Sequence, residues 1–318
     1  MTVKSVKRQP VLRRNQSPLK RDWHENWPLY ALLIPVLAYF IIFSYVPMSG
    51  ILMAFQDYKV TRGLWGSDWI GFENFIMLFE DEMFLPALRN SFAMAICNLT
   101  LGFIAPIILA ILITSIRPGR HTRLVQTITY LPNFVSSVVV CTLAIEFLDT
   151  DGAVTAVLSA LGLEQQNWLA NGDVPVFWLI NTGIGIWQMA GWSSVIYIAA
   201  IYNINGDLHE AAAIDGANRW QRLIHITLPG ILPMIMMMLT LKIGLVFRDG
   251  FDKVLLLYMP LTYDTADCLH TYTYRMAFGG MPDYGLSTAS GLFQSVIATI
   301  LLIISNTLNK KATGYALY

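Results

Sequence analysis

Residues 210–233 read EAAAIDGANRWQRLIHITLPGILP and form a polar, helix-favouring segment between two long apolar runs. Asp207 and Glu210 give the D-x-x-E pattern of a helix start, in which the Asp side chain caps a free N–H and the Glu reaches back. Gly216 interrupts a run of small residues, at a point where glycine turns the backbone at little cost. The Leu-Pro pair at 228–229 closes the segment. We expect a rigid structure that another protein grips from outside the membrane.

An amphipathic helix lying on the membrane surface is the alternative interpretation of this segment. Helices of that kind carry a basic polar face. Here three acids, Asp207, Glu210 and Asp215, outnumber the two arginines, Arg219 and Arg222. The charge pattern therefore favours a docking segment over a surface anchor.

The composition is that of an integral membrane protein. The chain has 318 residues, of which 55% are hydrophobic and 13% are charged, whereas soluble domains contain about 25% charged residues. Cys97, Cys141 and Cys268 are too few and too scattered for a disulfide framework.

Six apolar runs are long enough to cross a hydrocarbon core, which needs about 20 residues of helix. The first run is longer than the apolar region of about 7 to 15 residues in a cleavable signal peptide, so we expect it to be retained. An even number of spans places both chain termini on one side of the membrane. The expected spans are residues 28–55, 87–116, 124–148, 176–202, 228–247 and 288–308.

The distribution of charge identifies that side. Of the 21 basic residues, 14 lie in the N-terminal tail, in the connections at 117–123 and 203–227, and at the C-terminus, whereas 16 of the 21 acidic residues lie elsewhere. Basic residues accumulate on the cytoplasmic side of membrane proteins. We therefore expect a multi-pass protein of the cell (inner) membrane, with both termini and the segment at 210–233 in the cytoplasm.

The motifs of an independent enzyme are missing from the sequence. It has no G-x-x-x-x-G-K-[ST] phosphate loop, and its five histidines lack the H-E-x-x-H spacing of a zinc site. It also has no G-x-S-x-G nucleophile motif. We expect no catalytic residue, no metal site and no nucleic-acid partner.

Lys242 is the most informative polar residue within the spans. It lies 14 residues after Leu228, or about 21 Å along a helix. Ionisable groups at that depth usually face a bundle interior or a transport pathway, although a lysine can also snorkel outward or pair with a structural carboxylate. We expect Lys242, Asn181, Gln188 and Arg248 to line a substrate path. Polar residues within the membrane also join helices to one another, which is the alternative role for the uncharged ones.

A resemblance to a known family rests on the spacing E-A-A, three residues, Gly, nine residues, I-x-L-P. This pattern resembles the EAA loop of the permease subunits of type I ABC importers. Leu223 departs from it, because the family often has an aromatic residue at that place. The matching residues are Glu210, Ala211, Ala212, Gly216, Ile226, Leu228 and Pro229.

Three further stretches are similar to the polysaccharide-type permeases of that family, so the resemblance covers most of the chain. They are PVLAYFIIFSYVPMSGILMAFQDY at 35–58, TYLPNFVSSVVV at 129–140 and LSTASGLFQSVIATILLIISN at 286–306.

The resemblance implies a fold and a coupling site. We expect an all-α integral membrane protein with six transmembrane helices in the MetI-like bundle of type I ABC importer permeases. In that family the loop forms two short coupling helices, bent at the glycine, which dock in a groove on a cytoplasmic ATPase. The residues implied in coupling to the ATPase are Glu210, Ala211, Ala212, Asp215, Gly216, Ala217, Arg219 and Pro229.

We expect four parts along the chain. A basic cytoplasmic tail at 1–27 is followed by the first transmembrane helix and an outer loop at 28–86, a five-helix permease core at 87–310, and a cytoplasmic C-terminal tail at 311–318. The core includes the coupling segment, by which we mean residues 205–229.

The resemblance also implies partners and cargo. We expect this chain to form half of a translocation pathway that a second, homologous permease completes, in a heterodimer. Two ATPase subunits would bind ATP and Mg, and an extracytoplasmic solute-binding protein would deliver an oligosaccharide. The chain itself would be a non-catalytic subunit in contact with lipid and would bind no cofactor.

Cations on the central and outer part of the path suggest that the oligosaccharide is acidic, such as a uronate oligomer. Acidic residues close by in the sequence could neutralise these cations. The cations are Lys242, Arg248, Lys253 and Arg275, and the acids are Asp249, Asp252, Asp264 and Asp267.

Two other classes of protein remain as alternatives. A proton- or sodium-coupled carrier would need no ATPase, and a membrane-embedded enzyme would need a catalytic constellation. An ABC exporter is disfavoured, because such chains usually lack this loop.

Overall fold

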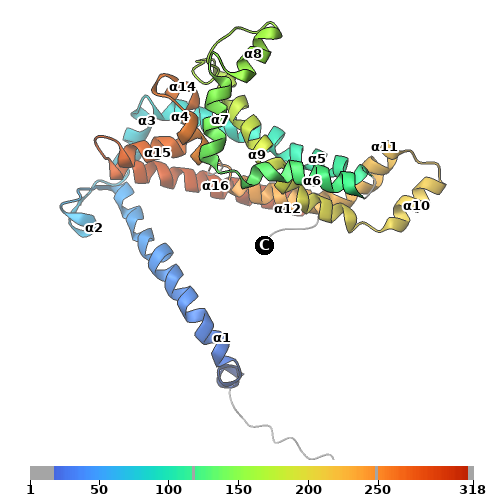
Figure 1. The fold of residues 1–318 in the computed structure, drawn as a ribbon. Helices are drawn as coiled ribbons and strands as arrows, with labels where there is room; N and C mark the ends of the chain where they lie inside the picture. The colour runs from blue at the N-terminus through green and yellow to red at the C-terminus, as the bar shows by residue number, and fades with distance from the viewer. Residues whose placement is uncertain (1–17, 117–118, 248–249, 314–318) are drawn as a thin grey trace, which may run out of the picture. The chain divides into compact units, whose positions relative to one another are not determined.

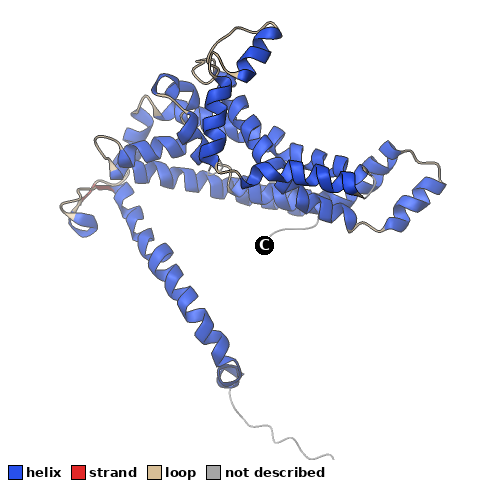
Figure 2. Ribbon diagram, in the orientation of Figure 1, coloured by secondary structure: helices blue, strands red, loops and turns tan. Residues whose placement is uncertain are grey.

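The computed structural model describes residues 18–116, 119–247 and 250–313 (Figure 1). Figure 2 shows that helices make up most of these residues. The chain divides into two compact units, residues 1–52 and residues 53–318, and each is described here by itself.

The first unit is dominated by one apolar helix. It consists of the α-helix α1 (Pro18–Phe40), the π-helical turn η1 (Ile41–Tyr45) and the start of the 3₁₀ segment η2 (Val46–Phe55). The stretch Asn26–Phe55 has 30 residues and a mean hydropathy of 2.2. It is therefore long and apolar enough to cross a membrane.

The helix changes its winding at Pro47, which has no N–H to donate. Just before it, the N–H of Val46 bonds to the carbonyl of Ile41, five residues back, which is the π pattern. The backbone then continues as 3₁₀ helix. The proline is thus accommodated without ending the helix.

The second unit contains the remaining elements. Its one sheet within the described residues pairs two short strands antiparallel, β1 (Gln56–Asp57) and β2 (Asp68–Trp69). The helices before the coupling segment are α2 (Gly63–Gly66), α3 (Glu73–Glu80), α4 (Phe84–Cys97), η3 (Asn98–Gly102), α5 (Phe103–Ser115), α6 (Arg120–Tyr130), η4 (Leu131–Phe134), α7 (Ser137–Leu148), α8 (Ala153–Ala160) and α9 (Val174–Tyr202). Those that follow are α10 (Gly206–Ile214), α11 (Arg219–Arg222), η5 (Leu223–Thr227), α12 (Leu228–Gly244), α13 (Phe251–Leu257), η6 (Pro260–Thr262), α14 (Tyr263–Ala266), α15 (Leu269–Phe278) and α16 (Tyr284–Thr313).

The all-α membrane fold predicted from the sequence is confirmed. Among the described residues, five helices are long and apolar enough to cross a membrane, or six if the bent pair α6–α7 counts as one span. The spans of the second unit are Phe84–Ser115, Pro175–Tyr202, Arg219–Gly244 and Tyr284–Lys311.

The span expected over 124–148 consists of two helices that meet at a sharp bend. The axes of α6–η4 and α7 differ by 96° at this point. Pro132 has no N–H for a helical bond, and Ser136 starts a new helix, since its Oγ accepts a hydrogen bond from the N–H of Val139 at 3.4 Å. The apolar run is therefore a broken span whose middle exposes non-helical backbone.

Close packing positions α9 at the centre of the second unit. Its residue Tyr197 is buried with Ala110 and Ile113 of α5. A Cβ added at Gly191 would overlap the carbonyl oxygen of Thr129 on α6, so only glycine allows this approach of the two backbones. Helices α12 and α16 also lie side by side (Figure 1).

A network of buried polar groups ties together α4, α14 and α15, which we call the outer helices. Asp267 accepts hydrogen bonds from Arg275 and from Thr271, both at 2.6 Å. The amide of Asn90 on α4 donates to the carbonyl of Asp267 at 3.0 Å. Burial raises the pKa of the Asp267 carboxyl, although the hydrogen bond from Arg275 acts in the opposite direction.

Candidate coupling surface and transport cavity

The first helix of the coupling segment, α10, begins two residues earlier than the sequence predicted. Its cap is Asn205, whose Oδ1 accepts a hydrogen bond from the N–H of Asp207 at 3.0 Å. Asp207 therefore lies in the first turn, where its charge is favourable near the positive end of the helix dipole. The expected cap at Asp207 is wrong because Asn205 offers the same chemistry two residues earlier in the chain.

The second feature of this segment is the turn at Gly216, which the sequence predicted. Gly216 has a φ of +82°, in the left-handed region that favours glycine. The N–H of Ala217 bonds to the carbonyl of Ala212 at 2.8 Å, and the N–H of Gly216 bonds to the carbonyl of Ala213 at 3.2 Å. These two bonds form a Schellman motif, so the end of α10 is fixed by its backbone.

The second helix, α11, starts at a capping box. The side chain of Asn218 accepts from the N–H of Gln221 at 2.9 Å, and the side chain of Gln221 accepts from the N–H of Asn218 at 2.7 Å. From there α11, η5 and α12 form one helical span, Arg219–Gly244, of 26 residues. Pro229 does not close the segment as predicted, because the π-turn η5 accommodates the proline within the continuing helix.

The coupling segment presents an exposed surface of mixed character. The apolar side chains of Ile214 and Trp220 are 87% and 71% exposed, and Glu210, Asp215 and Arg219 are also exposed. Figure 1 shows α10 and α11 beyond the ends of α5, α6 and α12. Apolar groups of this size, rimmed by charges, are typical of a protein-binding surface.

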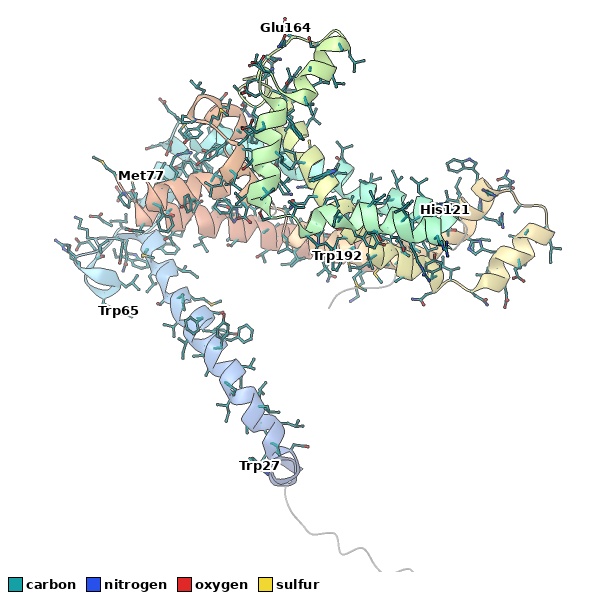
Figure 3. The ribbon with its side chains drawn as sticks, in the orientation of Figure 1. Trp27, Trp65, Met77, His121, Glu164 and Trp192 are labelled. Carbon is teal, nitrogen blue, oxygen red and sulfur yellow. The ribbon has the colours of Figure 1, made fainter. Side chains whose placement is uncertain are left out.

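The bend between the two coupling helices forms a shallow depression of about 370 Å³. It lies at the same end of the bundle as His121 at the start of α6, whereas Met77 of α3 lies at the opposite end (Figure 3). The lining residues are Ala212, Asp215, Gly216, Ala217, Gln221, Arg222, His225 and Ile226.

A cavity of about 630 Å³ lies between α9, the end of α12, the start of α13 and the break between α6 and α7; we refer to it as the first cavity. The structure brings together three of the four residues predicted for the substrate path, since Lys242, Asn181 and Gln188 all line it. The fourth, Arg248, lies outside the described residues.

Two lysines lie in the first cavity, and each is close to a glycine. A Cβ added at Gly102 would be 3.5 Å from the Nζ of Lys242, and a Cβ added at Gly185 would be 3.5 Å from the Nζ of Lys253. Both ammonium groups therefore lie at van der Waals distance from these glycine positions. Asp252 is the one carboxylate among the described lining residues.

Arg275 does not belong to this group of cations. Its guanidinium pairs with the buried Asp267 and lies 4.5 Å from the ring centre of Tyr263. Neutralisation of this cation by a nearby acid was the alternative that the sequence left open. Arg275 therefore stabilises the outer helices.

The uncharged polar residues of the first cavity differ in their bonding. Gln188 donates to the carbonyl of Val135 at 3.0 Å and so holds the break between α6 and α7. Asn181 is 6% exposed, and its Oδ1 has no hydrogen-bond partner among the described residues. A buried acceptor without a partner costs about 1–3 kcal/mol, so this site favours a ligand or water that donates to it.

Sequence reasoning missed the wall formed by the break itself, which contributes Asn133, Ser136 and Ser137. Irregular backbone at membrane depth is tolerated where it lines a water-filled cavity. The signal was present in Pro132 followed by Ser136, which together read as the end of one helix and the cap of the next.

Comparisons with known proteins agree with this geometry. The family model described as "Binding-protein-dependent transport system inner membrane component" matches residues 102–313. The chain is 38% identical to Protein LplB of Bacillus subtilis (strain 168), over 98% of this chain and 97% of the relative. It is 37% identical to the polygalacturonan/rhamnogalacturonan transport system permease protein YteP of the same organism, over 91% and 90% of the two chains.

Two solved structures are similar throughout. One is described as a bacterial ABC transporter involved in the import of the acidic polysaccharide alginate, with a TM-score of 0.85 and 38% identity over 93% of this chain and 100% of the other. The second is a bacterial alginate ABC transporter in complex with an alginate pentasaccharide-bound periplasmic protein, with a TM-score of 0.86 and 37% identity over 95% and 100%.

Proposed function

This chain belongs to the family of binding-protein-dependent transport system inner membrane components, and from that premise we propose that it forms one half of the translocation pathway of an ATP-driven oligosaccharide importer. One observation carries the proposal. A single helical span, Arg219–Gly244, joins the exposed coupling surface to the first cavity. Arg219 lies at one end of this span, and Lys242 lies near the other. At 1.5 Å per residue this span is about 39 Å long.

The proposed mechanism transmits force along this helix. Two ATPase subunits, which hold ATP and Mg, receive the coupling segment in a groove, and their closure moves α10 and α11 together because Gly216 fixes the bend between them. The exposed Glu210, Asp215 and Arg219 pair with charges of the ATPase, and the small side chains of Ala211, Ala212 and Ala217 allow close approach. Pro229 lies in the first turn of α12, just after the π-turn η5, and the movement of the coupling segment passes into α12 at this point.

The proposed assembly contains three kinds of partner. A second, homologous permease completes the pathway, the ATPases bind on the cytoplasmic side, where both termini also lie, and an extracytoplasmic solute-binding protein docks at the opposite end. The solved alginate transporter in complex with a periplasmic protein supports this arrangement. Purification of the chain from its native membrane should yield all of these ATPase and permease subunits together. Isolation of the chain without any nucleotide-binding subunit would instead favour an ion-coupled carrier.

The proposed cargo is a carboxylate-bearing oligosaccharide. Lys242 and Lys253 place two ammonium groups in the first cavity against one carboxylate, Asp252, among the described lining residues. At about 4 Å and an effective dielectric constant of about 20, each ammonium attracts a carboxylate by about 4 kcal/mol before desolvation is subtracted. Relatives that carry polygalacturonan and alginate support the same chemistry.

Transport assays with the assembled complex test the cargo. We expect proteoliposomes to take up uronate oligomers in preference to neutral oligosaccharides of equal length. A preference for the neutral oligosaccharides would refute the proposal that the cargo bears carboxylates, but it would not refute the proposed importer function.

A further inference from the structure

The structure contains a second cavity, of about 790 Å³. It adjoins the first cavity, because Gly250 and Asp252 line both. Its walls come from the end of α12, the start of α13, α15 and α16. The lining residues are Gly244, Leu245, Phe247, Gly250, Phe251, Asp252, His270, Thr273, Gly291, Gln294, Ser295 and Ala298.

The chemistry of this second cavity differs from that of the first. Its described lining contains neither lysine nor arginine, and its one carboxylate is Asp252. Asp252 disfavours a carboxylate ligand, since like charges disfavour each other at short range, and the described lining of this cavity lacks the two lysines that offset Asp252 in the first cavity. Thr273, Gln294 and Ser295 instead offer neutral polar groups. Their hydroxyl and amide donors bond within the protein, to Leu269, Thr273 and Gly291, so what they present to a ligand hydroxyl is acceptor oxygen.

Gln294 supplies a buried acceptor with unused hydrogen-bonding capacity. Its side chain is 5% exposed, and its Nε2 donates to the carbonyl of Leu269 at 3.2 Å and to the Oγ1 of Thr273 at 2.9 Å. Because a carbonyl can only accept, these bonds fix which end of the amide carries the oxygen. The Oε1 has no hydrogen-bond partner among the described residues, so this buried acceptor has unused capacity for a donor, and satisfying it would be favourable.

An aromatic wall accompanies these polar groups. Phe247, Phe251 and His270 line the cavity, and the ring centroids of Phe251 and His270 are 5.9 Å apart. Ligand sites commonly combine an apolar aromatic wall with a few fixed polar groups. A sugar ring fits both parts, since it has an apolar C–H face and a rim of hydroxyls.

We propose that the second cavity is a subsite for a neutral, hydroxyl-bearing sugar unit of the same oligosaccharide whose carboxylate-bearing unit occupies the first cavity. The inference rests on the proposed function as an oligosaccharide permease. It adds that the pathway distinguishes neutral from acidic units along one cargo chain, through separate sets of residues.

Gly291 provides a direct test, because it lines the second cavity and a Cβ added there meets no atom within 4 Å. Gly291→Trp therefore places a bulky side chain at the wall of the cavity from a position where the Cβ itself is unobstructed. Gly183→Trp is the matched control, since Gly183 has the same free space on a span but lines neither cavity. Uptake is measured with the full complex in proteoliposomes, for a pure uronate oligomer and for an oligomer of alternating neutral and uronate units.

We expect Gly291→Trp to weaken the apparent affinity for the mixed oligomer about tenfold, with the pure uronate oligomer and the control variant unchanged within about twofold. Equal loss for both oligomers, or no loss for either, would overturn the subsite while the importer stands. Failure of the unmodified complex to transport either oligomer would instead overturn the proposed function.

Thiol labelling gives a second measurement that does not depend on transport. Ser295 is exposed and lines the same cavity. The thiol introduced by Ser295→Cys in the full complex should react with a small thiol reagent, and the mixed oligomer should slow that reaction more than the pure uronate oligomer does. The parent complex gives the background from its three native cysteines. A thiol that is unreactive, or that neither oligomer protects, would contradict the proposal.

Discussion

Replacement of Gly216 should uncouple ATP hydrolysis from transport in a graded manner. The residue has a φ of +82°, and a left-handed backbone costs an ordinary L-residue about 1–2 kcal/mol. That cost shifts the population with the correct bend by a factor of about 5 to 30. Asn tolerates this region best, Ala less well and a β-branched residue least. We therefore expect stimulated ATPase activity and uptake to fall in the order Gly216→Asn, Gly216→Ala and Gly216→Val, and to be abolished in Gly216→Pro.

The assay compares substrate-stimulated ATPase activity with cargo uptake, in complexes whose membrane insertion is checked separately. Gly206→Ala is the matched control, because Gly206 lies in the same segment, has open space around it and lacks a positive φ. Normal stimulation and uptake in Gly216→Val would refute the idea that a fixed bend between α10 and α11 transmits force.

Three further changes test the cavity, the packing and the outer helices. Lys242→Gln should weaken apparent affinity for uronate oligomers about tenfold, or about 1.4 kcal/mol, and spare neutral ones; equal loss for both would contradict a charge-reading role. Gly191→Val should lower the melting temperature of the purified complex, because its side chain overlaps the carbonyl oxygen of Thr129, and an unchanged temperature would show that α6 and α9 separate easily. Arg275→Met leaves the buried Asp267 carboxylate without its cation, so it should destabilise the outer helices by about 3 kcal/mol at pH 8. Burial already raises the pKa of Asp267, and below that pKa the neutral acid needs no cation, so the deficit should shrink as pH falls; a deficit that grows would be inconsistent with this account.

Local chemistry made much of the coupling segment predictable. A glycine after a run of alanines indicates a turn whatever the surroundings, and Gly216 adopts it. The start of α10 was predicted at Asp207 rather than at Asn205, because both residues can cap a helix and only the backbone geometry decides between them. Pro229 was assigned to the end of the segment, whereas a π-turn carries the helix past it.

The transmembrane region was predictable in number of spans but not in the shape of its cavities. Hydropathy located the apolar run at 124–148. It did not show the bend after Pro132, because hydropathy does not depend on the direction of the helix axis. Lys242 was recognisable because a charge within an apolar span is costly. Gln294 gave no such signal, since its role depends on acceptors supplied by α15.

The central claim is that ATP hydrolysis by partner subunits drives oligosaccharide import through this chain. Its most direct test is uptake of a labelled uronate oligomer into proteoliposomes that contain the complete complex and its solute-binding protein, with no ion gradient across the membrane. The account predicts uptake that requires ATP and is lost in Gly216→Pro. Uptake that proceeds equally well without ATP, or that appears only when a proton or sodium gradient is imposed in a parallel assay, would contradict it.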